Sequence, residues 1–116
     1  MTGQSENGFT VPDDAVDLGH DHYLAYSQWA PDRKLNPHSA HLPDVEKYGA
    51  LIFHTSAETG QPCAGFVTFA GDVQREVAPN ATTWDVQSWE PLTIVPSVLC
   101  SCGDHGFVSN GQWVPA

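Results

Sequence analysis

The sequence predicts a small, mainly β single domain, with an antiparallel sheet or sandwich, a C-terminal β-hairpin and a loop-rich N-terminal arm. Three observations support this fold class. The chain has 116 residues, a length that suits one hydrophobic core. Short apolar runs alternate with turn residues along most of the chain. No amphipathic helix longer than about three turns can be drawn.

The first 22 residues are polar and acidic, and we expect an N-terminal arm there, followed by one β-rich domain over residues 23–116. Residues 23–29 are aromatic and aliphatic and predict a short strand, which Pro31 ends. Residues 31–46 contain three prolines together with His38 and His41. This composition predicts a long ordered loop.

The central part of the chain predicts a hairpin and two further strands. Residues 50–53 and 64–69 are apolar or β-prone, and a turn-like segment at 58–62 separates them. In residues 83–89, Trp84, Val86 and Ser88 would share one face of a strand. Residues 92–99 predict another strand, which Pro96 restricts to an edge or a bulge.

The C-terminus gives the clearest local prediction. Asn110-Gly111 lies between the apolar segments 106–109 and 112–114. Asn-Gly supplies the positive φ angles of a type I′ turn, so a terminal β-hairpin is expected.

Charge restricts the classes of partner. The chain has 14 acidic and 4 basic residues, a net charge of −10, which repels nucleic acid and anionic membrane surfaces. The charge serves solubility or docking to a basic surface. The first eight residues lack the charged and apolar regions of a signal peptide, so we expect a protein that is not secreted.

Three cysteines and a histidine suggest a metal site. Cys100, Cys102 and His105 lie within six residues, and Cys63 in an earlier turn is the natural fourth ligand, with His54 as the substitute. Sulfur and nitrogen donors favour zinc, which takes four of them. A full set would close a structural site, whereas a missing ligand would leave a position for water.

Other interpretations of these residues stay open. The cysteines could be ordinary buried thiols, because free cysteine is among the most buried residue types. Cys63 could form a disulfide with one of the later pair. A nucleophilic cysteine with His105 as base is a third alternative, although nothing in the sequence lowers the pKa of any thiol.

Two histidine pairs and four tryptophans also bear on function. His20 with His22, and His38 with His41, could assemble a second metal site or lie in surface loops. The tryptophans form either core or a binding face, and Trp113 is the one expected to contact a partner. The sequence has no glycine-rich phosphate loop, nucleophile elbow or His-Glu-x-x-His motif.

The C-terminal part of the chain carries a pattern of short motifs. It runs from Trp84-Asp85-Val86 and Glu90-Pro91-Leu92-Thr93-Ile94 through Pro96-Ser97 and Cys102-Gly103-Asp104-His105-Gly106-Phe107 to Gly111-Gln112-Trp113. Over residues 49–114 it resembles a group of small proteins from tailed bacteriophages and prophages. In that group a Pro-Ser step precedes a Cys-x-x-His pair, which Cys102 and His105 match. Of the group's earlier cysteine cluster only Cys63 is present, so Cys100 or His54 would have to complete four ligands.

The resemblance implies a phage origin and no particular activity. The first hypothesis is therefore a non-enzymatic phage structural or accessory protein, zinc-stabilised, that docks on a capsid or tail surface or on its own copies. It would reside in the virion or the host cytoplasm. The alternatives are a metal-dependent hydrolase using His20, His22, His38 or His41 with an aspartate base, and a host-directed inhibitory effector.

Overall fold

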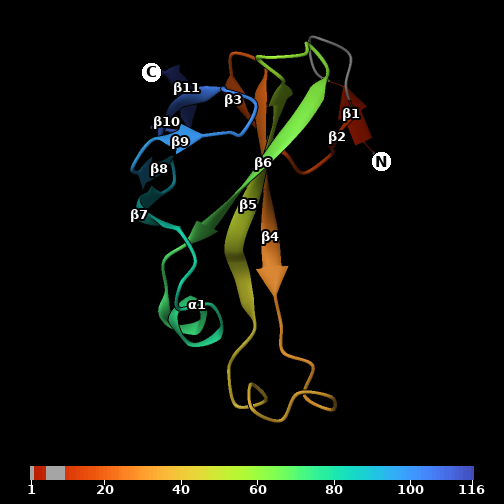
Figure 1. Ribbon diagram of the computed structural model, residues 1–116, viewed down its shortest axis with the longest axis vertical. Helices are drawn as coiled ribbons and strands as arrows, with labels where there is room; N and C mark the ends of the chain where they lie inside the picture. The colour runs from red at the N-terminus through yellow and green to blue at the C-terminus, as the bar shows by residue number, and fades with distance from the viewer. Residues whose placement is uncertain (1, 5–9) are drawn as a thin grey trace.

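The structure is a computed structural model that describes residues 2–4 and 10–116. Within these residues it contains eleven β-strands and one short α-helix (Figure 1). The predicted mainly β fold class is confirmed. The longest dimension is 44 Å and the other two are 30 and 27 Å.

The largest sheet has six strands, and the chain passes through them in sequence order. They are β3 (Val16–Gly19), β4 (His22–Trp29), β5 (Val45–Thr55), β6 (Pro62–Phe69), β7 (Thr83–Trp89) and β8 (Leu92–Val95). Neighbouring strands are antiparallel except β6 and β7, which are parallel. Parallel neighbours need a crossover, and here it contains the helix α1 (Asp72–Val77).

Two smaller sheets complete the fold. The C-terminal sheet has the order β11 (Gln112–Pro115), β10 (His105–Ser109) and β9 (Val98–Leu99). The N-terminal pair is β1 (Thr2–Gln4) with β2 (Thr10–Pro12). Asn110 and Gly111, between β10 and β11, have φ angles of 51° and 72°, so the predicted type I′ hairpin is confirmed.

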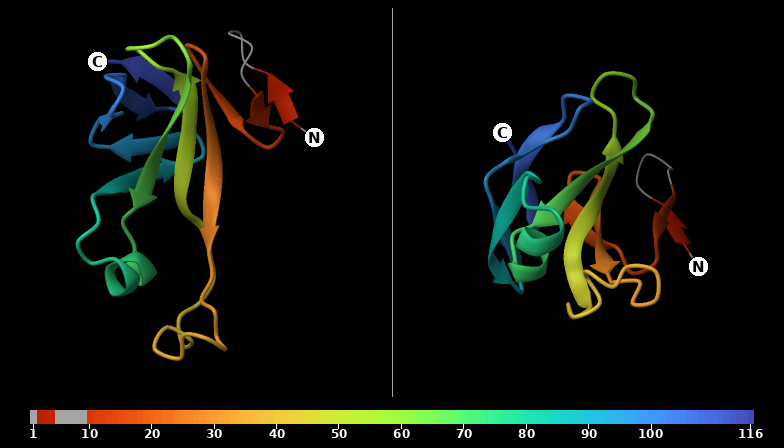
Figure 2. Two further views of the ribbon diagram at one scale, coloured as in Figure 1. Left: turned by 45° about the vertical axis from the view of Figure 1, so that its right-hand side comes forward. Right: turned by 60° about the horizontal axis from the view of Figure 1, so that its bottom comes forward.

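The hydrophobic core lies between the six-stranded sheet and the C-terminal sheet. Figure 2 shows the C-terminal strands against one side of the long β4, β5 and β6 strands, and the β1–β2 pair beyond the other side. Alternate side chains of each strand point inward, as the period of a strand requires. The core residues are Leu18, Leu24, Ala50, Ile52, Val67, Phe69, Leu92, Ile94, Val98, Val108 and Trp113.

The structure differs from the sequence-based expectation in the N-terminal arm. Residues 10–12 and 16–19 form strands, and β3 is a member of the main sheet. Leu18 is only 1% exposed, because its strand pairs with β4 and turns this side chain into the core. Residues 1 and 5–9 of the expected arm lie outside the described residues.

The strand expected over residues 92–99 is divided. β8 ends at Val95 and β9 begins at Val98, so Pro96 lies in the break. Proline has no N–H to donate to a strand ladder, which explains why pairing stops there. The consequence is that β9 leaves the main sheet and pairs with β10 instead.

Candidate metal centre

Four potential metal ligands meet where the β5–β6 hairpin touches the loop between β9 and β10. They are His54 in β5, Cys63 in β6, and Cys100 and Cys102 in the loop. Their ligand atoms all lie within 4.8 Å of one another. His54 is 2% exposed and Cys102 is 7% exposed, so the group is largely shielded from solvent.

Strand register brings His54 and Cys63 together. The two residues are direct partners in the antiparallel β5–β6 ladder. His54 continues the inward alternation of Ala50 and Ile52, and Cys63 shares the inward face of Val67. Both side chains therefore point to the face that the C-terminal sheet covers.

A tight turn presents the other two thiols. The Cys100 N–H donates to the Asp104 carbonyl at 2.8 Å, and the Gly103 N–H donates to the Cys100 carbonyl at 2.9 Å. Gly103 has a φ of 96°, a conformation that glycine adopts without strain. The turn curls the chain so that Cys100 and Cys102 both reach the hairpin.

Two distances inside the cluster fit a tetrahedral ion. Sulfur atoms at about 2.3 Å from zinc are about 3.8 Å apart in a regular tetrahedron, and a sulfur–nitrogen edge is about 3.6 Å. The observed distances are 3.7 Å between the Sγ atoms of Cys63 and Cys100 and 3.3 Å between Cys102 Sγ and His54 Nε2. The cluster could therefore bind a metal ion.

The tautomer of His54 suits a metal ligand. Its Nδ1 lies 2.9 Å from the Ile52 carbonyl, which can only accept, so Nδ1 carries the proton. In a neutral ring this leaves the lone pair on Nε2, the atom that faces the cysteines. A backbone carbonyl on the second nitrogen is the usual way in which a protein fixes a ligating histidine.

The thiols differ in acidity. Burial alone would raise the pKa of Cys102, but hydrogen bonds with the backbone of Ala57 and Asp104, together with the side chains of His54 and Cys100, lower the pKa to about 6. Burial and hydrogen bonds to Cys100 and Cys102 raise the pKa of Cys63 to about 11. Cys102 is thus held as the thiolate that a metal requires.

A hydrogen-bonded pair lies beside the cluster. His22 Nε2 is 2.6 Å from Asp104 Oδ2, and His22 Nδ1 donates to the His20 carbonyl at 2.8 Å. Two ligands of one tetrahedral ion would be about 3.4 Å apart, so 2.6 Å is the distance of a charge-assisted hydrogen bond. The His22 ring also stacks on Trp113 at 4.2 Å and on His54 at 5.4 Å.

His22, His54 and Asp104 form a second group of possible ligands, and it overlaps with the first. His54 has only Nε2 free to bind an ion, since Nδ1 is occupied by Ile52. One nitrogen cannot serve two ions, so the groups are alternatives. The tetrahedral distances favour the cysteine group, and the His22–Asp104 pair then packs around it.

The structure does not bring His105 into the cluster. Its side chain is exposed, and Nε2 lies 2.9 Å from the Ser97 hydroxyl. His105 belongs to β10, where neighbouring residues alternate, and Gly106 and Val108 take the inward positions. His54, which the sequence offered as the alternative fourth ligand, lies in the cluster instead. The inward spacing of Ala50, Ile52 and His54 is the signal that distinguishes the two histidines.

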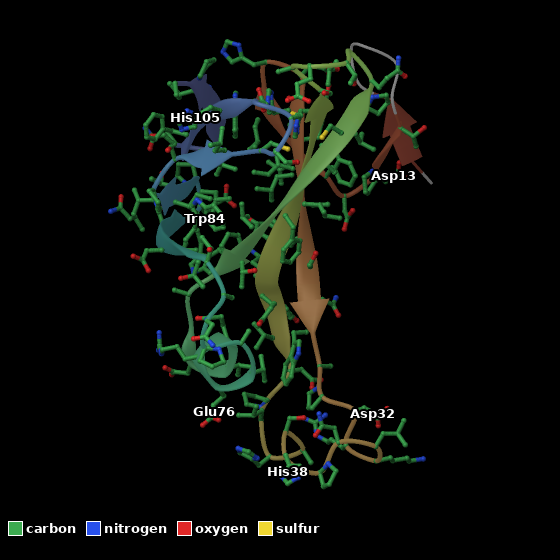
Figure 3. All side chains as sticks on the ribbon, viewed as in Figure 1. Asp13, Asp32, His38, Glu76, Trp84 and His105 are labelled. Carbon is green, nitrogen blue, oxygen red and sulfur yellow. The ribbon has the colours of Figure 1, made fainter. Side chains whose placement is uncertain are left out.

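The remaining histidines do not converge. His20 and His41 are exposed, and His38 lies in the loop between β4 and β5. Figure 3 shows His38 at the opposite end of the molecule from the sulfur atoms, drawn in yellow. Of the four histidines that the hydrolase hypothesis names, His22 alone belongs to a group of possible ligands among the described residues, together with His54 and Asp104.

Trp113 differs from its expected role. It is 3% exposed and belongs to the core, where it covers the backbone of Gly106 and stacks on His22. The sequence could not reveal that Trp113 is buried. β11 has a single buried residue, Trp113 itself, so no alternating pattern marks its inward face.

Comparisons of the chain with protein-family models, curated proteins and solved structures found no match. Among the described residues, none of the helical structure is long and apolar enough to cross a membrane.

Proposed function

We propose that His54, Cys63, Cys100 and Cys102 bind one zinc ion in a structural site, and that the domain is a non-enzymatic docking module. The observation that carries the metal proposal is the pair of distances, 3.7 Å between two sulfur atoms and 3.3 Å between sulfur and nitrogen. Three thiolates and one imidazole are a standard structural zinc set.

A closed site supports a structural role over a catalytic one. Catalytic zinc keeps one position for water or substrate, whereas four protein ligands fill a tetrahedron. Both ring nitrogens of His22 are occupied, Nδ1 by the His20 carbonyl and Nε2 by Asp104, so His22 has no free nitrogen to act as a general base for a bound water.

The position of the site supports a contribution to folding. The ligands connect the β5–β6 hairpin of the main sheet with the loop that leads into β10 of the C-terminal sheet. Zinc binding to small domains contributes about 10–16 kcal/mol of apparent free energy, which becomes folding free energy when the unfolded chain lacks the site. A chain of 116 residues buries less of its surface than a larger domain and gains most from such a crosslink.

The docking part of the proposal rests on surface chemistry. Leu99, Phe107 and Val114 are 65%, 43% and 45% exposed, and Phe107 and Val114 are cross-strand partners on the outward face of the C-terminal sheet. An exposed apolar stripe of this kind is typical of protein contact. The net charge of −10 favours a partner with a basic surface. The resemblance implies only a phage origin, and a capsid or tail protein is the partner that we propose within that setting.

Cobalt substitution tests the metal proposal. The metal-free chain titrated with Co²⁺ should take up one equivalent and develop the intense visible and thiolate charge-transfer bands of tetrahedral sulfur coordination. Cys102→Ser should weaken the bands and bind less tightly. Ser101→Ala is the matched control, because it changes an exposed residue of the same turn. Octahedral spectra in the wild type, or equal spectra in all three proteins, would rule the site out.

Co-sedimentation tests the docking proposal. The chain should sediment with purified phage particles at low salt and less at high salt, since electrostatic attraction is screened. The Phe107→Asp variant should remain in the supernatant. Sedimentation that is insensitive to both salt and the substitution, or none at all, contradicts docking through this surface.

A further inference from the structure

Two of the four ligands form a close thiol pair. Cys63 Sγ and Cys100 Sγ are 3.7 Å apart, although the residues are separated by 37 positions in the chain. Cys63 is partly exposed and lies near the start of β6, so a small oxidant can reach it from solvent. Cys100 follows β9, a strand of only two residues at the edge of its sheet.

Cys102 also makes contacts outside the group of three thiols. Its sulfur accepts hydrogen bonds from the backbone of Ala57 and Asp104 and lies 3.3 Å from His54 Nε2. It is also 7% exposed. These contacts shield Cys102 and fix its direction, so the three thiols are not equivalent toward an oxidant.

We propose that Cys63 and Cys100 are a site of reversible disulfide formation, and that hydrogen peroxide acting on this pair releases the metal. The inference rests on the proposed zinc site. Forming the bond requires the sulfur atoms to approach from 3.7 Å to about 2.05 Å. That movement withdraws two ligands at once, and Cys102 with His54 is too small a set to retain zinc.

The reaction balances in two steps. As a zinc ligand Cys63 is a thiolate despite its raised pKa, and this thiolate attacks one oxygen of hydrogen peroxide. An S–O bond forms, the O–O bond breaks, and hydroxide leaves and takes a proton to become water. The Cys100 thiolate then attacks the Cys63 sulfur, the S–S bond forms, the S–O bond breaks, and a second hydroxide becomes water. The two sulfur atoms lose two electrons to the peroxide, and Zn²⁺ leaves unchanged. A dithiol reductant reverses the modification.

The experiment first measures zinc and then oxidises the same sample. Purified zinc-loaded chain is treated with stoichiometric hydrogen peroxide, released zinc is followed with a metallochromic dye, and disulfides are mapped by peptide mass spectrometry. We expect one zinc per chain before treatment, and zinc release that parallels a Cys63–Cys100 disulfide. Reduction with added Zn²⁺ should restore the starting state.

Serine variants identify the pair, and they are compared as metal-free chains because each lacks a ligand. Cys102→Ser retains both thiols and should form the disulfide at the rate of the metal-free wild type. Cys63→Ser also retains two thiols, so it controls for the number of thiols, and it should not form a disulfide at that rate.

Each unfavourable outcome has one meaning. Zinc-loaded protein that keeps its metal under peroxide, or that links Cys63 to Cys102 instead, overturns this inference and leaves the zinc site standing. Protein that never holds zinc overturns the proposed function, and the release step with it, whatever disulfide the metal-free chain then forms.

Discussion

Replacement of His54 is the sharpest test of the ligand set, because the sequence offered two histidines for the same place. His54 is 2% exposed with Nε2 toward Cys102, whereas His105 is exposed and bonded to Ser97. An apparent zinc-binding free energy of about 10–16 kcal/mol, divided over four ligands, assigns about 2.5–4 kcal/mol to each. His54→Ala should therefore weaken zinc binding roughly 100- to 1,000-fold.

A competition titration against a chromophoric zinc chelator measures this loss. His105→Ala is the matched control and should bind zinc within about threefold of the wild type, a difference of less than 1 kcal/mol. His54→Cys restores a four-ligand set, so it should recover most of the affinity and separate ligand loss from unfolding. The reasoning fails if His54→Ala binds as the wild type does, or if His105→Ala loses as much.

Three substitutions near the site provide further predictions. A Cβ at Gly106 would lie 2.5 Å from Trp113 Cε2, so Gly106→Ala should lower the free energy of unfolding by about 1–3 kcal/mol in urea, with exposed Gln112→Ala near zero. In the metal-free chain the pKa of Cys102 falls from 9.0 to about 6, so its thiolate stabilises the fold fully above pH 9 and no longer below pH 6. Ultraviolet thiolate absorbance should show a midpoint near pH 6 that Cys102→Ser removes, and a first midpoint near 9 would contradict it. Asp104→Ala removes the partner of a buried imidazole and should cost about 1.5–3 kcal/mol in unfolding. It should change zinc affinity less than tenfold, because Asp104 is not one of the four ligands and its backbone hydrogen bond to Cys102 remains.

Local sequence signals predicted those parts of the fold that depend on neighbouring residues. The Asn110-Gly111 turn needs only two positive φ angles. The strands β5 and β6 were predicted from short apolar and β-prone runs on either side of a turn, which are also local signals. Leu18 is a core residue that local signals do not predict. Its strand has four residues, two of them polar or flexible, and it becomes core only by pairing with β4.

The candidate site was partly predictable for the same reason. Chain proximity pointed to Cys100 and Cys102, and turn chemistry pointed to Cys63, but the choice of histidine depends on which face of a strand each one occupies. His105 is next in the chain after the cysteine turn, yet β10 directs it outward, whereas His54 is 48 positions from Cys102 and faces it. The His22–Asp104 pair depends on a contact across 82 positions, which no local pattern contains.

The proposed zinc ion and the proposed disulfide both crosslink the β5–β6 hairpin to the loop between β9 and β10. They imply an order of stability for the zinc-bound, the oxidised metal-free and the reduced metal-free domain. A disulfide between Cys63 and Cys100 closes a loop of 37 positions, which removes about 4 kcal/mol of unfolded-state entropy in the chain-entropy model. Zinc contributes more, about 10–16 kcal/mol of apparent binding free energy. Urea unfolding should therefore rank the zinc form as the most stable, the oxidised metal-free form next, and the reduced metal-free form last. If the oxidised form unfolds at the lowest urea concentration, then forming the disulfide strains the β9–β10 loop by more than the closure entropy. The pair could not then act as a reversible site in a folded domain.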